Sequence, residues 1–250
     1  MKNQLIFATL LLVSTVAVSN AADNDPLPSA NAVLNKMLQH DAQRRRLVDG
    51  YQGMRRYVLE NSRMHKQAEL IARVESESDG TKHFEVVQEA GWKAAEKHVF
   101  QKMLDSEAEA SHPEIRLRTQ VSPENYECRM AGMEVIAGRL AYAIDVTPKR
   151  HEERLFEGRI WIDAQDFALV QVEGKPAKNP SFWIHSIHFV HTYQKSGPFW
   201  FPSSTESVTE ARLFGTTRVT IKYFDYIPKP PVKSETASAQ LPTRTPITSQ

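Results

Sequence analysis

The amino-acid sequence predicts an α+β protein in which one antiparallel sheet is covered by helices. Two segments early in the chain have apolar residues at helical spacing, and three short strand-like runs lie between them. After Pro113 the chain is strand-like almost to Tyr226. Turn residues recur there about every 10 to 12 residues, which is typical of a barrel or a sandwich.

The composition excludes several classes of function. The 250 residues carry 31 basic and 30 acidic side chains, whereas a nucleic-acid-binding protein shows a basic excess or stripe. The single cysteine excludes an intramolecular disulfide and a multi-cysteine zinc site. Charged residues make up 24% of the chain, which argues against a protein with several membrane spans. We therefore expect no nucleic-acid partner.

Residues 1–21 have the features of a secretory signal peptide. A basic start is followed by an apolar stretch and by small residues that end at Ala21. The alternative is a membrane anchor, but the apolar run is shorter than the roughly 20 residues that span a bilayer. Cleavage near Ala21 predicts an exported protein with no stable membrane span. Cys128 lies in a strand-like stretch and is expected to be buried, the alternative being an intermolecular bond.

The mature chain is expected to form one domain with short flanking segments. Residues 22–30 are predicted to be a linker, and 31–227 a single domain. Residues 228–250 contain five prolines, many Ser and Thr, and few large apolar side chains. Such a segment cannot bury enough surface to offset its ordering entropy, so we predict a disordered tail.

The first predicted helix covers residues 29–48. Ser29 and Asn31 are both plausible N-caps. Arg44–Arg46 follow near its C-terminal end, where positive charge suits the helix dipole, and a solvated helix end is the favoured interpretation over a ligand site. The apolar face consists of Val33, Leu34, Met37 and Leu38.

The second predicted helix covers residues 92–108. Its apolar face is wide, so we expect the helix to pack over a sheet. The residues of that face are Trp92, Ala95, Val99, Phe100, Met103 and Leu104.

The remaining regular segments alternate with a period of two, as strands do. Eleven are predicted, and turn residues such as Gly, Pro, Asp and Ser separate them. They are 51–59, 68–74, 82–88, 114–121, 125–136, 139–147, 154–163, 167–174, 183–194, 199–210 and 216–226.

Several of these strands carry large side chains on both faces, as Trp161 and Ile162 do within 154–163. A sheet with one wet face needs only one apolar side. The simpler interpretation is a large core. The alternative is a concave surface that stays partly free for a hydrophobic ligand. The residues predicted to line such a cavity are Tyr57, Leu59, Val99, Phe100, Met103, Ile144 and Trp161.

No set of residues predicts catalysis, a metal or a cofactor. His185, His188 and His191 suggest a metal, but strand alternation places His188 opposite the other two. Asp163 and Asp166 could act as paired carboxylates, although acids are common in such loops. The sequence has no nucleophile elbow, zinc-binding His-Glu-x-x-His motif or phosphate loop. A hydrolase that uses these acids or histidines is the least favoured alternative.

The order of elements resembles the periplasmic lipoprotein-carrier superfamily, the LolA, LolB and RseB-like proteins. The resemblance covers about residues 30–227. It is carried by 142–149, by 158–163 with its Trp-Ile-Asp, by 167–173, and by closing segments at 199–202, 214–215 and 219–226.

The resemblance implies a half-closed antiparallel barrel, capped by helices on its concave face, that holds acyl chains in an apolar cavity. It implies a non-enzymatic periplasmic carrier or chaperone in outer-membrane biogenesis, with a lipid or lipoprotein as ligand and an envelope protein that loads or receives it. The alternative within this fold is a lipid-sensing regulatory module. Arg44–Arg46 and Arg55–Arg56 both compete for the arginine that such carriers require. Five methionines would suit an adaptable lining, namely Met37, Met54, Met103, Met130 and Met133.

Overall fold

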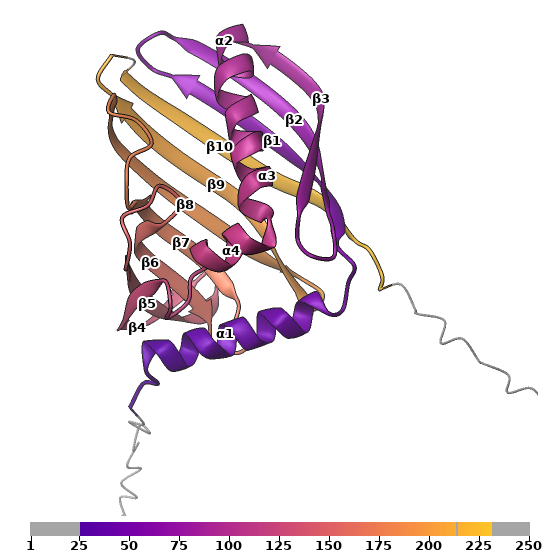
Figure 1. Ribbon diagram of the computed structural model, residues 1–250, viewed down its shortest axis with the longest axis vertical. Helices are drawn as coiled ribbons and strands as arrows, with labels where there is room; N and C mark the ends of the chain where they lie inside the picture. Colours follow the sequence, from indigo (N-terminus) through magenta and orange to yellow (C-terminus); the bar gives the residue numbers. More distant parts are fainter. Residues whose placement is uncertain (1–25, 214, 232–250) are drawn as a thin grey trace, which may run out of the picture.

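The computed structural model describes residues 26–213 and 215–231, so the predicted signal peptide, the first part of the predicted linker and most of the predicted tail lie outside the described residues. The described chain forms one open, ten-stranded antiparallel sheet with helices on one side (Figure 1). The strand order is β3-β2-β1-β10-β9-β8-β7-β6-β5-β4. The first strand pairs with the last inside the sheet, and β3 and β4 form its two edges.

The strands run between the turn residues that separate the predicted strands. Their bounds are β1 Tyr51–Asn61, β2 Lys66–Ser76, β3 Lys82–Gly91, β4 Tyr126–Ile136, β5 Arg139–Pro148, β6 Phe156–Asp163, β7 Leu169–Pro176, β8 Ile184–Ser196, β9 Phe199–Ala211 and β10 Gly215–Pro228.

The prediction of a strand at 114–121 is wrong, and the described sheet has ten strands where eleven were expected. The segment forms helix α4, Pro113–Thr119. Proline is favoured at the first helical position, because its missing N–H would have no partner there and its fixed φ suits the helix. Glu114 in the first turn and two arginines in the last also complement the helix dipole. Alternation of Ile115 and Leu117 suggested a strand, but these end signals prevail.

Helix α1, Ala30–Arg45, confirms the first predicted helix and crosses one end of the sheet (Figure 1). Its apolar face is buried, with Leu34 fully inaccessible to solvent. Of the two predicted caps, the structure uses Ser29, whose Oγ accepts a hydrogen bond from the N–H of Ala32 at 3.2 Å. Asn31 lies inside the helix and is exposed.

The cap gives a first testable prediction. Replacing Ser29 by alanine is expected to lower the free energy of unfolding by about 1 kcal/mol, because one helix N–H loses its acceptor. Urea unfolding followed by circular dichroism measures the change. Asn31→Ala is the matched control and should leave stability almost unchanged. An equal or larger loss for Asn31→Ala would contradict the assignment of the cap.

The second predicted helix is also confirmed, with a distortion that the sequence did not reveal. It consists of α2, Lys93–Ala95, a π-helical segment η1, Glu96–Phe100, and α3, Gln101–Ser111. The segment lies over the half of the sheet formed by β1, β2 and β3 (Figure 1).

The covered face of the sheet holds two separate apolar clusters. The first lies under α1 and includes Leu34, Ile144 and Ile160. The second lies under η1 and α3 and includes Tyr57 and Phe100. A smaller cluster forms on the opposite face, around Trp161, Ala141 and Ala143. Apolar side chains thus occupy both faces of the sheet, and each helical segment covers its own half.

The sheet continues just past the predicted start of the tail. β10 ends at Pro228, and the N–H of Lys229 donates to the carbonyl of Gly50 at 2.9 Å.

Cys128 is half-buried as a free thiol, and burial raises its pKa. Within the described ranges, no helix combines the length and the apolar character that crossing a bilayer requires.

Candidate functional site

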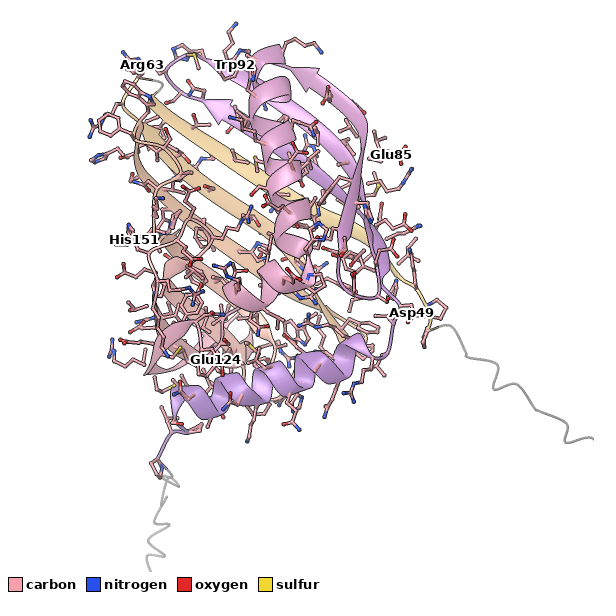
Figure 2. The ribbon with its side chains drawn as sticks, viewed as in Figure 1. Asp49, Arg63, Glu85, Trp92, Glu124 and His151 are labelled. Carbon is pink, nitrogen blue, oxygen red and sulfur yellow. The ribbon has the colours of Figure 1, made fainter. Side chains whose placement is uncertain are left out.

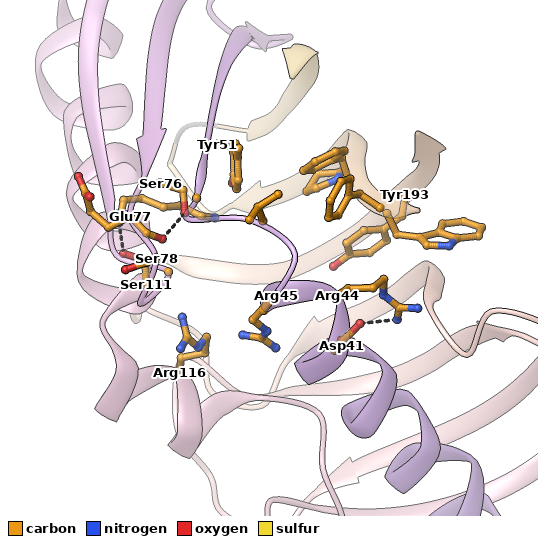
Figure 3. A pocket seen from close by; sticks show the side chains of 18 of the residues that line it. Asp41, Arg44, Arg45, Tyr51, Ser76, Glu77, Ser78, Ser111, Arg116 and Tyr193 are labelled. Carbon is orange, nitrogen blue, oxygen red and sulfur yellow. Dashed lines mark hydrogen bonds and ion pairs between the residues drawn. The ribbon is translucent and has the colours of Figure 1, made fainter. Parts of the chain in front are cut away.

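A pocket of about 430 Å³ lies where the two halves of the covered face meet (Figure 3). Four regions that are distant in sequence form it. These are the C-terminal part of α1 with the start of β1, the β2–β3 hairpin, the α3–α4 helices, and the β8–β9 hairpin. The strands bring these regions together, because β1, β9 and β3 start, and β2 and β8 end, at the same end of the sheet.

One wall of the pocket is aromatic. Tyr51, Tyr193 and the run Phe199–Phe201 line it, followed by Pro202. The ring of Phe201 stacks on Tyr226 with centroids 4.2 Å apart, and Tyr51 packs edge-on against Phe201 at 5.5 Å. Rings held by neighbouring rings in this way give a firm apolar surface.

The facing wall, which we call the basic wall, carries three arginines, Arg44, Arg45 and Arg116. The Arg44 guanidinium is bound to Asp41 at 2.6 Å. By contrast, Arg45 and Arg116 form no ion pair within the described part of the chain, and both lie at the pocket (Figure 3). Burial and the positive charge of Arg45 lower the pKa of Arg116, and together they outweigh the carboxylate of Asp79, which raises it. An anion between the two guanidinium groups would relieve this repulsion.

Gly80 brings Arg116 to the pocket. This glycine has a φ of +91°, and a Cβ there would come within 1.9 Å of Nη1 of Arg116. Only glycine adopts this conformation readily and leaves room for the guanidinium. The β2–β3 turn and α4 are therefore in contact at the basic wall.

A buried ionic cluster forms the inner side of the pocket. The side chain of Arg55 is 1% exposed and donates from Nη1 to the carboxylate of Glu107 on α3. Glu107 also accepts a hydrogen bond from Nζ of Lys82 at 2.8 Å. Burial raises the pKa of Glu107, but the charges of Lys82 and Arg55 outweigh it and hold the value at about 2. The helix layer is thus tied to the sheet by charge as well as by apolar contact.

Arg55 lies between two aromatic rings. Its guanidinium carbon is 5.0 Å from the ring centre of Phe84 and 4.9 Å from that of Tyr223. Within the described residues, its Nε and Nη2 atoms are buried without a hydrogen-bond partner. Burial disfavours the charged form of Arg55, but the attraction of the Glu107 carboxylate outweighs this effect, so the pKa of Arg55 is raised. Its neighbour Arg56 points away and pairs with Glu69 at 2.8 Å, as strand alternation requires.

A hydrogen-bonded chain extends the cluster across the sheet. Tyr223 and Thr205 share a hydrogen bond of 2.9 Å between their hydroxyl oxygens, and Thr205 also bonds to Nδ1 of His191. Burial lowers the pKa of His191 to about 4, so its ring is neutral at neutral pH. Thus His191, one of the histidines that suggested a metal, belongs to the covered face.

His185, His188 and Asp163, which were also considered for chemistry, do not line the pocket. His188 is exposed and lies 3.2 Å from Glu173, and His185 lines a separate polar groove. Asp163 accepts hydrogen bonds from the Arg139 side chain and from two backbone N–H groups of its own turn. Burial raises the pKa of Asp163, but the hydrogen bonds from Arg139 and these N–H groups outweigh burial, so the pKa is lowered overall. No cluster of metal-ligating side chains occurs in the ranges that the structure describes.

The seven residues predicted to line a cavity do not share one. Tyr57, Leu59 and Phe100 are fully buried in the second cluster, and Val99 and Met103 pack against it. The other two are apart from these, since Ile144 belongs to the first cluster and Trp161 lies on the opposite face, where its indole N–H donates to Glu134 at 2.9 Å.

Most of the pocket was not predicted from the sequence. Phe199–Pro202 was assigned to a strand and resembled a closing segment of the carrier fold, and Arg44–Arg46 was interpreted as a solvated helix end. Arg45 is indeed exposed, yet it also lines the pocket. The two segments were the available signals, but nothing in the sequence showed that they would meet.

Residues 118–227 match a family model described as a family of unknown function, DUF5686. No curated protein matches the sequence. A LolA superfamily protein from Nitrosomonas europaea is similar in structure, with 10% identity, a TM-score of 0.43, and coverage of 81% of this chain and 94% of that one.

Two further similar structures have comparable identities. A DUF1329 family protein from Desulfovibrio piger is 11% identical with a TM-score of 0.42, covering 82% of this chain and 94% of that one. A chain of the Pseudomonas aeruginosa MucA/MucB complex is 12% identical with a TM-score of 0.28, covering 80% and 99%. The chains that are similar in structure include a member of the superfamily that the sequence resembles. At these identities, function has to be inferred from the residues of this chain.

Proposed function

We propose that this protein is a periplasmic, non-enzymatic carrier that holds an amphiphile, a lipid or the acyl chains of a lipoprotein, at the pocket beside α1. The observation that supports this most is the pairing of an aromatic wall, Tyr193 and Phe199–Phe201, with the unpaired Arg45 and Arg116. Such a pocket offers one surface to a hydrocarbon chain and another to an anionic head group.

The two walls divide the binding energy between them. Each methylene removed from water contributes about 0.8 kcal/mol, so an acyl chain gains most from the apolar side. Guanidinium groups bind carboxylates and phosphates through charge-assisted hydrogen bonds. Arg45 and Arg116 would orient the head group, while the chain lies along Tyr193 and Phe199.

The part of the acyl chain farthest from the head group would lie between the helix layer and the sheet. Val99 and Met103 are only partly buried, and they pack against the cluster that contains Tyr57 and Phe100. A thioether side chain adapts its shape readily, and π-helical turns such as η1 are frequent at functional sites. We place the opening that admits the chain at this helix layer. An envelope protein that loads or receives the lipid completes the proposed cycle.

Tryptophan fluorescence tests the proposal, because the described tryptophans lie in different surroundings. Trp200 lines the pocket, whereas Trp161 lies on the opposite face of the sheet. A variant that keeps only Trp200 should be quenched, to saturation, by a brominated long-chain fatty acid. A variant that keeps only Trp161 should not be quenched. Equal quenching of both, or of neither, would contradict the proposed site.

Charge variants test the head-group contact. Replacing Arg45 or Arg116 by glutamine should weaken binding of the brominated fatty acid about tenfold each, because one charge-assisted hydrogen bond is lost. Arg118→Gln is the matched control, since Arg118 lies on α4 as Arg116 does and its side chain is 72% exposed. The corresponding brominated alcohol should bind all these variants equally. A loss for the alcohol as large as for the acid would argue against the anion contact.

A second candidate function, a regulatory interaction module, is favoured by the two open sheet edges. Six consecutive residues of β3, Glu85–Ala90, are exposed, and β4 has no neighbour beyond it in the described sheet. Unpaired strand edges can accept a strand from a partner protein. Pull-down of one envelope protein that survives saturation with fatty acid, together with absence of Trp200 quenching, would favour this function over the carrier.

A further inference from the structure

Three loops meet at the end of the sheet opposite the pocket. They connect β1 to β2, β7 to β8, and β9 to β10. The N–H of Ser62 donates to the carbonyl of Thr216 at 3.0 Å, and that of Arg212 donates to the carbonyl of Trp183 at 3.0 Å. Figure 2 shows Arg63 at this end of the molecule and Asp49 at the other. The backbone bonds hold the three loops as one surface, which we call the tip.

Large apolar side chains project from the tip. Phe182 is 74% exposed, Leu213 58% and Trp183 51%. The rings of Phe182 and Trp183 pack edge-on at 5.6 Å, and the Arg212 guanidinium lies 4.8 Å from the Phe182 ring centre. Phe182 and Trp183 are thus held in place while remaining open to solvent.

The tip is also basic. The described residues 61–66, 181–184, 211–213 and 215–216 contain Arg63, Lys66 and Arg212 and no acidic residue. In the whole chain, by contrast, 31 basic residues are almost balanced by 30 acidic ones. The local excess therefore marks a surface that attracts negative charge.

We propose that the tip docks the protein on a membrane surface that contains anionic phospholipid. Aromatic rings settle at the head-group level of a bilayer, where one side is apolar and the other wet. Basic side chains beside them are attracted by the negative surface of the membrane. Side chains that project from the ends of three loops can enter the head-group layer together. This inference goes beyond the proposed carrier function, since the tip lies away from the pocket and needs no ligand in it.

Vesicle sedimentation tests the docking surface with the full mature chain. Wild-type protein should sediment with vesicles of phosphatidylcholine and phosphatidylglycerol and much less with phosphatidylcholine alone. Replacing Arg63 and Arg212 by glutamine should lower the partition coefficient on the anionic vesicles roughly 20-fold. Replacing Phe182 and Trp183 by serine should lower it at least as much. The emission of Trp183 should shift to shorter wavelength on binding in the wild type.

Matched variants separate the tip from general effects of charge and hydrophobicity. Val135→Ser with Leu140→Ser removes two exposed apolar side chains at the opposite end of the sheet. Arg118→Gln with Arg129→Gln removes two exposed charges elsewhere. Both controls should sediment as the wild type does, and so should the pocket variant with Arg45 and Arg116 replaced by glutamine. The proposal would be overturned if the wild type did not sediment with the anionic vesicles, or if its sedimentation did not depend on phosphatidylglycerol. It would also be overturned if the control variants lost as much sedimentation as the tip variants do.

Discussion

Replacing Glu107 by glutamine is expected to lower the free energy of unfolding by about 3–5 kcal/mol, because Arg55 would keep a buried charge without its counter-charge. Arg55 is 1% exposed, and two of its nitrogen atoms already lack a partner within the described residues. Urea unfolding at neutral pH, extrapolated to water, measures the loss. The thermal midpoint of unfolding should fall as well.

The matched control is Glu109→Gln, two residues further along the same helix. Glu109 is bound to Arg154 at 2.5 Å, but the pair is exposed to solvent, so its loss should change the free energy of unfolding much less than the loss of Glu107 does. Replacing the buried pair together, Arg55→Met with Glu107→Leu, should cost less than Glu107→Gln alone, since no charge remains buried. Equal, small losses for Glu107→Gln and Glu109→Gln would show that the buried cluster does not stabilise the fold.

Stability is expected to fall in two stages as the pH is lowered from neutral. The pKa of His191 is about 4 in the fold, below its ordinary value of about 6.5, so its neutral form stabilises the fold above about pH 6.5. This contribution is lost as the pH falls from about 6.5 towards 4. The pKa of Glu107 is about 2, so its contribution is present above about pH 4.3 and is lost as the pH falls towards 2. Each stage should remove on the order of 2 to 3 kcal/mol.

Urea unfolding at a series of pH values separates the two stages. His191→Gln should flatten the dependence between pH 6.5 and 4, and Glu107→Gln should flatten it between pH 4.3 and 2. His185→Gln is the matched control for the first stage, because His185 is exposed and lines a groove. A wild-type curve that is flat between pH 6.5 and 4 would contradict the assignment of His191 as a buried neutral ring.

Most of the fold was predictable because its strands and helices carry strong local patterns. Ten of the eleven predicted strands form, because each combines apolar residues at alternate positions with turn residues at its ends. The error at Pro113–Thr119 arose from weighing the alternation of Ile115 and Leu117 above the helix end signals. The π-helical segment at Glu96–Phe100 could not be predicted, because it depends on how the helix packs on the sheet.

The candidate site was much less predictable, because it is assembled from distant segments. Arg45 and Arg116 are separated by most of the first half of the domain, and Tyr193 and Phe199 come from its other half. Each residue has an ordinary local explanation, as a helix end or as part of a strand. Only the closing of β1 on β10, which joins the two halves of the sheet, places them around one pocket.

Strand alternation nevertheless distinguishes the two adjacent arginines of β1. Arg55 shares a face with Tyr57 and Leu59 and is buried, whereas Arg56 pairs with Glu69 at the surface. A charged residue on the apolar face of a strand was therefore a signal for the buried cluster. Its partner Glu107 could not be identified, because the predicted helix gave no register against the sheet.

Native mass spectrometry of the mature protein, isolated gently from its own cell envelope, tests the central claim most directly. The account predicts a population heavier than the polypeptide by the mass of an acyl lipid, released as apo protein on activation. A variant with Arg45 and Arg116 replaced by glutamine should carry much less of it, while Arg118→Gln should carry as much as the wild type. Wild-type protein that shows only the polypeptide mass, under conditions that preserve its fold, would contradict the assignment of a lipid carrier.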